Sequence, residues 1–326
     1  MSFVNTARIL VSAALVCVPL AAQNNAAGPL IDIPDSALSA APMVIAYGDT
    51  RFTDPQQTEA TNPKVRRWLV DRIAAEKPDA LLVSGDLPWN GDVLNDYAVY
   101  HAETTPWRVA GILIFPALGN HEFHGKDPQL CLENWWNEFP KLRGLRWYSV
   151  ALGSRLRVLN LDTNASLLPD SEQLAWVKSQ LAALQPTVQF VFINLHHPPV
   201  ADVQAAPDDD HNPRPNEIAL AHVLKATAQQ KNVKLVVCSG HIHNYERFQQ
   251  DGIAYVVSGG GGAKPRPVVR ELNDLYRDRD FPNYHYVKFV LRDNRLDAEM
   301  IRVADPAAGT PSWQVKDRFQ IPAPTQ

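Results

Sequence analysis

The chain has 326 residues, of which 45% are hydrophobic and 20% are charged, an ordinary balance for a globular protein with a sizeable core. That length fits one large domain or two ordinary ones. The formal net charge is only −4 at pH 7, which argues against a nucleic-acid-binding surface.

The first 22 residues have the three parts of an export signal. Arg8 ends a short polar start, an apolar stretch follows, and small residues close it at Ala22. We expect cleavage after Ala22, secretion or release into the periplasm, and no stable membrane span afterwards, because the stretch is too short. An uncleaved anchor is the alternative. Residues 23–39 are expected to form a flexible lead-in.

The first two predicted strands both end in glycine and aspartate. The apolar run of residues 43–47 leads into Gly48-Asp49-Thr50-Arg51, and the run of residues 80–84 leads into Gly85-Asp86. Helical spacing over residues 61–76, with Asn62-Pro63 as a good start, joins the two strands. The βαβ pattern places both aspartates at one edge of a sheet.

A third strand, predicted over residues 111–118, leads into Gly119-Asn120-His121-Glu122. At a strand end, this sequence puts an amide oxygen and an imidazole into the same cleft. Residues 128–139 are expected to be helical, and their tryptophans fit the core or a cleft wall better than a cofactor site.

The middle of the chain predicts paired strands at residues 147–152 and 155–162, then a helix over residues 171–184. The most strand-like run, residues 188–195, ends in His196-His197-Pro198-Pro199. Adjacent residues of an extended chain point to opposite sides, so we expect at most one of these histidines to join the cleft as a ligand. Residues 201–215 read as a polar loop containing His211.

A helix over residues 216–230 precedes a strand that ends in Ser239-Gly240, followed by His241 and His243. Side chains at i and i+2 project to the same side, so both imidazoles can face one cleft; a pair of surface histidines is the alternative. The strand of residues 253–258 runs into four glycines that could cradle phosphate, although close backbone packing fits better without a P-loop lysine. A hairpin over residues 286–303 closes the domain, predicted as residues 40–303, and residues 304–326 are expected to form a Pro-rich surface tail.

Predicted strand ends therefore supply carboxylate, amide and imidazole donors. This mixture suits Mn²⁺, Zn²⁺ or Fe better than Ca²⁺ or a thiolate zinc site. The donors are too many for one ion, and two ions sharing a carboxylate and a hydroxide would use them all, which is the chemistry of phosphoester hydrolysis by in-line attack. The predicted metal ligands are Asp49, Asp86, Asn120, His196, His241 and His243.

Five sequence blocks, at residues 48–49, 85–86, 119–122, 196–199 and 239–247, together resemble the calcineurin-like metallophosphoesterases. The last block is similar to the purple acid phosphatase branch of that family. The resemblance implies an α/β fold, a four-layer α/β/β/α sandwich of two mixed sheets that holds a dinuclear metal site at its edge.

By motif position, the resemblance implies that Asp86 bridges the two metal ions. Asp49 and His243 would belong to one ion, and a second set would belong to the other. That second set is Asn120, His196 and His241. His121 would contact phosphate and assist the leaving group, and His211 is the candidate for the further histidine that related bacterial sequences carry in a loop.

The chain departs from the family pattern at two positions. Arg51 stands where most members have a histidine, and Trp89 stands where purple acid phosphatases have a tyrosine. Neither side chain can ligate a metal. We therefore expect no ferric purple centre. Arg51 is suited to grip a phosphate oxygen, with a structural salt bridge as the alternative.

The leading function is an exported metal-dependent phosphatase acting on a small-molecule phosphoester. A nucleotide phosphodiesterase is the nearest alternative, and a catalytically weakened phosphate-binding protein is the alternative from another class. After cleavage two cysteines remain, Cys131 and Cys238, which either pair or stay as buried thiols.

Overall fold

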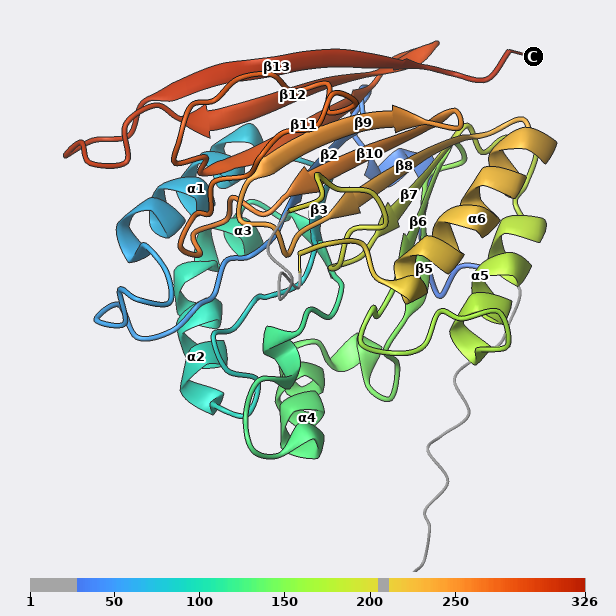
Figure 1. Ribbon diagram of the computed structural model, residues 1–326. Helices are drawn as coiled ribbons and strands as arrows, with labels where there is room; N and C mark the ends of the chain where they lie inside the picture. The colour runs from blue at the N-terminus through green and yellow to red at the C-terminus, as the bar shows by residue number, and fades with distance from the viewer. Residues whose placement is uncertain (1–27, 205–210, 326) are drawn as a thin grey trace, which may run out of the picture.

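Two mixed β-sheets lie face to face with helices outside them in the computed structural model, which describes residues 28–204 and 211–325 (Figure 1). The predicted export signal and residues 23–27 of the predicted lead-in lie outside the described residues. Within the described part of the chain, no helix has the length and apolar character needed to cross a membrane.

The first sheet combines parallel and antiparallel pairs. β6 to β7, β7 to β8 and β8 to β10 run parallel, so the carboxyl ends of these four strands share one edge. All five residues of β7 are buried, as expected for a strand covered on both faces. Its strand order is β1 (Ile31–Ile33), β5 (Tyr148–Leu152), β6 (Leu156–Asn160), β7 (Phe190–Asn194), β8 (Lys234–Ser239), β10 (Ile253–Ser258) and β9 (Tyr245–Gln250).

The second sheet joins a parallel half to an antiparallel half. β2, β3 and β4 run parallel, and β11, β12 and β13 continue the sheet as antiparallel neighbours. Its strand order is β13 (Trp313–Pro322), β12 (Arg295–Val303), β11 (His285–Leu291), β2 (Met43–Tyr47), β3 (Ala80–Val83) and β4 (Leu113–Pro116).

Helices cover the outer faces and complete the four layers. Leu174 of α5 and Leu220 of α6 pack with residues of β7 and β8 in one apolar core. Between the sheets, the rings of Phe192 and Phe289 lie 5.3 Å apart. On the far side, the Trp107 ring of α3 packs against Tyr47 of β2 at 5.9 Å. The six α-helices of the described residues are α1 (Pro63–Glu76), α2 (Leu94–Glu103), α3 (Thr105–Val109), α4 (Pro128–Glu138), α5 (Glu172–Ala182) and α6 (Pro215–Gln230).

The predicted helix start before α1 is correct in detail. The Asn62 side chain accepts a hydrogen bond from the backbone N–H of Val65, and Pro63 occupies the first helical turn. Asparagine satisfies an unpaired N–H there, and proline has no N–H to leave unpaired. The four-layer sandwich of two mixed sheets is thus the fold that the sequence predicted.

Both predicted domain ends need correction. Residues 31–33 of the predicted lead-in form β1, which pairs in parallel with β5. The predicted surface tail contains β13, which pairs along the whole of β12 with one register shift between Met300 and Ile301. Apolar residues alternate at Trp313, Val315, Phe319 and Ile321, a period of two that favours a strand. The proline count of this segment obscured that pattern.

The two described cysteines are buried and unpaired, which decides between the two alternatives for them. Cys131 lies on α4 and Cys238 lies on β8. Burial raises the pKa of both thiols, to about 11 for Cys131, so neither is a reactive thiolate at neutral pH.

Candidate metal centre

The predicted ligands gather at the edge where the carboxyl ends of the parallel strands meet. Two glycines allow the sheets to approach there. A Cβ on Gly119 would lie 2.5 Å from the backbone nitrogen of Asp86, and a Cβ on Gly85 would lie 2.7 Å from Nδ1 of His196. No side chain fits at such distances, so the recurring glycines permit the contact between strand ends.

The backbone at this edge is unusual. Asp49, Arg51, Asp86 and His241 all have positive φ angles, between 47° and 70°. Left-handed backbone is costly for residues with a Cβ and concentrates at functional sites. Four such residues together indicate that the fold specifies where these side chains point.

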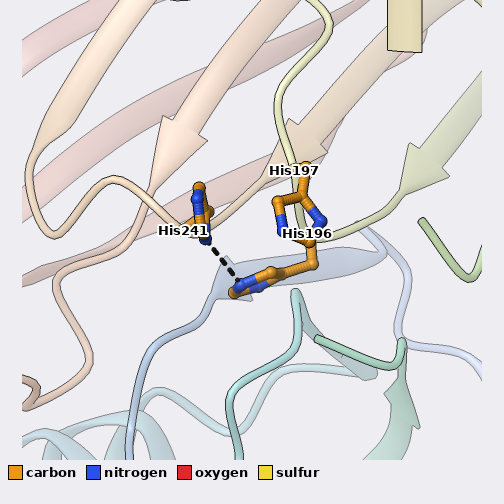
Figure 2. A group of neighbouring side chains, drawn as sticks. All are labelled: His196, His197 and His241. Carbon is orange, nitrogen blue, oxygen red and sulfur yellow. Dashed lines mark hydrogen bonds between the residues drawn. The ribbon is translucent and has the colours of Figure 1, made fainter. Parts of the chain in front are cut away.

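Asn120, His196 and His241 form what we call the second ligand cluster. Nε2 of His196 lies 2.9 Å from Oδ1 of Asn120 and 3.1 Å from Nδ1 of His241, as the dashed line in Figure 2 marks for the two rings. Oδ1 of Asn120 is 3.2 Å from the same His241 nitrogen. Three donor atoms from three different loops thus converge on one point.

The orientation of His196 is fixed by its other nitrogen. Nδ1 lies 2.8 Å from the carbonyl oxygen of Ser84, and a carbonyl can only accept a hydrogen bond. Nδ1 therefore carries the proton, and Nε2 turns its lone pair toward the cluster. Such a backing hydrogen bond is usual for metal-ligating histidines.

Asp49, Asp86 and His243 form the first ligand cluster, whose ligand atoms lie within 4.8 Å of one another. Nε2 of His243 is 3.5 Å from Oδ1 of Asp49, and its Nδ1 donates to the carbonyl oxygen of Lys264 at 2.8 Å. Burial lowers the pKa of His243 to about 3, so the ring is neutral and able to ligate at pH 7. Oδ1 of Asp49 is buried and has no hydrogen-bond partner among the described residues.

Asp86 lies between the two clusters. Its Oδ1 is 3.2 Å from Nε2 of His196 and accepts the backbone N–H of His121 at 2.9 Å. Its Oδ2 is 3.1 Å from Nη2 of Arg51. Burial alone would raise the pKa of Asp86, but nearby His196, His121 and Arg51 hold it well below its ordinary value. Burial raises the pKa of Asp49 to about 7.

His197 lies closer to the site than predicted. Its ring packs 4.2 Å from that of His241, and its ligand atom joins those of His196 and His241 within 4.8 Å (Figure 2). The chain bends at His196 and His197 after β7 ends, so the alternation of an extended strand does not apply there. Nδ1 of His197 is hydrogen-bonded to the hydroxyl of Thr163 at 2.7 Å.

His121 lies beside the Asp86 carboxylate and is held by Trp89. Its Nδ1 donates to the carbonyl oxygen of Trp89 at 2.6 Å, and the two rings stack at 4.8 Å. Nε2 then lies 3.8 Å from Oδ2 of Asp86. Burial lowers the pKa of His121 to about 4. The free nitrogen is positioned to exchange a proton with a group bound at the first ligand cluster.

The remaining predicted site residues also lie at this edge. Arg51 pairs with Asp86, and its guanidinium packs over the Trp89 ring at 5.2 Å. The ring of His211 lies 4.9 Å from that of His241, and Nη1 of Arg266 lies 3.5 Å from its Nδ1. Residues 205–210 of the predicted loop lie outside the described residues.

Two supporting residues escaped prediction. The Glu122 carboxylate accepts backbone N–H groups of Asp86, Leu87 and Gly119 at 3.0, 2.8 and 2.6 Å. The Asn194 side chain, at the end of β7, donates to carbonyl oxygens of β3 and β4 at 3.2 and 3.3 Å. Glu122 could have been noticed from its place in the Gly119–Glu122 turn, whereas the position of Asn194 depends on how the sheets face each other.

The donor set fits transition-metal ions. Neutral imidazoles, an amide oxygen and two carboxylates are borderline-hard ligands, and the unpartnered oxygen of Asp49 is a buried acceptor that a cation would satisfy. Among the described residues, Asp86 is the carboxylate with one oxygen near His196 of the second cluster and the other near Arg51 at the first. The arrangement can hold two ions side by side, although Arg51 competes for one oxygen of the first cluster.

Comparison with known proteins agrees with this geometry. The calcineurin-like phosphoesterase family model matches residues 44–245. A probable cyclic nucleotide phosphodiesterase from Vesicomyosocius okutanii is 24% identical over 215 residues, which are 65% of this chain and 83% of that protein.

Solved structures share the fold. A purple acid phosphatase from yellow lupin seeds superposes with a TM-score of 0.69 and 20% identity over 89% of this chain, which spans only 55% of that longer protein. A dimetal phosphatase from Danio rerio gives a TM-score of 0.58 at 14% identity, covering 90% of this chain and 99% of that one. The family match covers more than half of the sequence and contains all six predicted metal ligands. The chain therefore belongs to the calcineurin-like phosphoesterase family.

Proposed function

We propose that this chain is an exported phosphatase that hydrolyses small phosphomonoesters at a dinuclear metal site. The observation that carries the proposal is the position of Asp86. One of its oxygens faces His196 of the second ligand cluster, and the other faces Arg51 and His121. The ligands of two ions, a cationic phosphate anchor and a proton donor thus surround one carboxylate.

The two clusters would divide the ions as the motif positions suggest. Asp49, His243 and Asp86 would hold one ion, and Asn120, His196, His241 and Asp86 would hold the other. When bound, such ions supply a hydroxide nucleophile at neutral pH and stabilise charge on phosphoryl oxygens. Mn²⁺, Zn²⁺ and Fe are all compatible with these donors.

The protein's own groups would do the rest. Arg51 would bind a phosphate oxygen, because guanidinium matches the geometry and charge of phosphate. His121 would take up a proton from water at Nε2 and pass it to the leaving oxygen, since its Nδ1–H is fixed on the Trp89 carbonyl. His211, which stacks near His241, would help to hold the substrate.

Arg51 also supports a preference for monoesters. A phosphomonoester is a dianion near neutral pH, whereas a diester carries one charge. One charge-assisted hydrogen bond is worth roughly 1.5–3 kcal/mol, so a monoester preference of about tenfold or more in kcat/KM is expected. The relative described as a probable cyclic nucleotide phosphodiesterase supports diester hydrolysis as a second candidate.

The test compares p-nitrophenyl phosphate with bis-p-nitrophenyl phosphate and 2′,3′- and 3′,5′-cyclic AMP, using purified mature protein of measured metal content. A kcat/KM at least about tenfold higher for the monoester supports the phosphatase. A higher kcat/KM for any of the diesters would instead support the phosphodiesterase. If the metal-loaded protein binds phosphate but hydrolyses none of these substrates, it is the catalytically weakened phosphate-binding protein.

Export is a separate part of the proposal. The sequence of residues 1–22 supports it. N-terminal sequencing of protein recovered from the periplasm or the medium should begin near residue 23. A full-length product confined to the cytoplasm contradicts export without affecting the phosphatase assignment.

A further inference from the structure

The first ligand cluster already contains a positive charge of its own. Nη2 of Arg51 lies 3.1 Å from Oδ2 of Asp86, and the arginine side chain is only 12% exposed. An ion held by Asp49, Asp86 and His243 would need an Asp86 oxygen, and the other one, Oδ1, accepts the His121 N–H and lies 3.2 Å from Nε2 of His196. The guanidinium and a metal ion therefore compete for the same atom.

The arginine backbone is fixed at this position. Its N–H donates to the carbonyl oxygen of Asp86 at 2.9 Å, and its carbonyl oxygen accepts from Nη1 of Arg66 at 3.1 Å. The positive φ of 47° turns the residue out of the strand path of β2. The Arg51 side chain thus starts from a backbone position that these hydrogen bonds fix.

Trp89 holds the side chain in place. The guanidinium carbon lies 5.2 Å from the centre of the Trp89 ring, a favourable cation–π distance. The same indole stacks on His121. The two positions where this chain lacks the family's metal ligands are therefore in contact, and the replacement at one stabilises the replacement at the other.

Among the described residues, no arginine forms an ion pair at the second ligand cluster as Arg51 does at the first. Asn120 carries no charge, and Nδ1 of His196 is directed away from the cluster to the Ser84 carbonyl. Like charges repel strongly where water is largely excluded. A cation approaching the first cluster meets the guanidinium, whereas one approaching the second cluster meets Nε2 of His196, Oδ1 of Asn120 and Oδ1 of Asp86.

We propose that the Arg51 guanidinium serves as the built-in cation of the first ligand cluster, so that this chain retains one tightly bound metal ion, in the second cluster, and binds another only weakly. The proposal rests on the proposed function for the identity of the site. In the absence of substrate, the site would then hold one metal ion and the Arg51 guanidinium beside Asp86.

The test measures metal stoichiometry in the absence of substrate. Parent protein, Arg51→His and Arg51→Gln are loaded with Zn²⁺ or Mn²⁺, dialysed against metal-free buffer, and analysed by inductively coupled plasma mass spectrometry. We expect one ion per chain for the parent and two for Arg51→His, which gains a ligand and loses a charge. Arg51→Gln, which only loses the charge, should bind its second ion more tightly than the parent by isothermal titration calorimetry.

Matched variants assign the retained ion. Arg51→Lys keeps the positive charge and should resemble the parent. His196→Ala in the parent should remove the retained ion, whereas His243→Ala should leave it. The proposal is wrong if the parent protein keeps two ions as firmly as Arg51→His does. It is also wrong if the retained ion is lost in His243→Ala and kept in His196→Ala. If Arg51→His does not fold, the comparison of Arg51→Gln with Arg51→Lys decides the same question.

The outcome is separable from the proposed function. A parent that holds one ion but hydrolyses no phosphoester refutes the phosphatase and leaves the stoichiometry intact. A parent that hydrolyses phosphomonoesters with two firmly bound ions refutes this inference alone.

Discussion

The two ligand clusters solve the same problem by different means. The second cluster combines an amide with two imidazoles, and the ring of His196 is fixed by the hydrogen bond from its Nδ1 to the Ser84 carbonyl. The first cluster buries two carboxylates, which need positive charge nearby, and Arg51 supplies it. The tautomer of the histidine rings determines the geometry of the second cluster, and the balance of buried charges determines that of the first. The two clusters should therefore respond differently to substitution.

The largest expected effect comes from the residue that both clusters share. Asp86→Asn removes the charge that an ion in either cluster would use and breaks the ion pair with Arg51. We expect phosphoesterase activity to fall to background and bound metal to be lost. Steady-state kinetics and metal analysis check this. Full metal content with normal turnover would show that Asp86 does not connect the clusters.

His121 should separate proton transfer from metal binding. His121→Ala is expected to lower kcat by about 10²–10⁴, the usual contribution of a general acid–base residue, without changing metal content. His124 is the matched control, because its Nδ1 lies 3.3 Å from the same Trp89 carbonyl but its side chain is exposed. If His124→Ala costs as much as His121→Ala, the loss reflects the Trp89 loop and not the acid.

Arg51 should affect substrate affinity more than the chemical step. Arg51→Ala is expected to raise KM and weaken inhibition by inorganic phosphate, with kcat/KM falling roughly 10–10²-fold, as for one lost charged hydrogen bond. Inhibition constants measured at a fixed, saturating metal concentration check this. Unchanged phosphate inhibition together with a lower melting temperature would make Arg51 structural only.

The smallest effect at neutral pH is expected for a buried histidine outside both clusters. Burial lowers the pKa of His285 to about 4, against about 6.5 in an unfolded chain. Between these values the unfolded state binds a proton that the folded state does not, so stability falls as pH drops from about 6.5 to about 4 and is unaffected above. The accumulated cost is up to roughly 3 kcal/mol.

His285→Gln should therefore flatten the acid limb of the stability curve and leave turnover at pH 7 unchanged. Urea unfolding at pH 7 and pH 4.5, for the parent and the variant without metal, measures the difference. An equally steep acid limb in the variant would assign the effect to other buried groups, among which His243 of the first ligand cluster is the next candidate.

Much of the site was predictable because the sequence repeats one local pattern at the ends of its strands. Apolar strands end in glycine followed by a polar ligand, and parallel strands bring such ends to one edge. Asp49, Asp86, Asn120 and His241 could all be placed from that pattern. Their division into two clusters also matched the motif positions.

The remainder depended on contacts between distant segments. The pairing of Arg51 with Asp86, and the contacts of Trp89 with Arg51 and His121, require knowledge of how the loops after β2, β3 and β4 face each other. The nearness of the His197 ring to that of His241 was not predicted, because the chain bends after β7 and the rule for extended strands does not apply there. β13 was missed although its alternation was visible, since prolines near it suggested a surface tail.

β13 exposes one edge of its sheet to other molecules. As the outermost strand of its sheet, it leaves one row of backbone N–H and C=O groups without a sheet partner, which invites another strand to add on. Consecutive charged residues Lys316, Asp317 and Arg318 oppose such addition. Asp317 also receives hydrogen bonds from Tyr245 and Arg247 of β9, so the outer strands of the two sheets are tied together (Figure 1). These hydrogen bonds hold the outer strands of the two sheets together, and the charged residues of β13 disfavour edge-to-edge pairing.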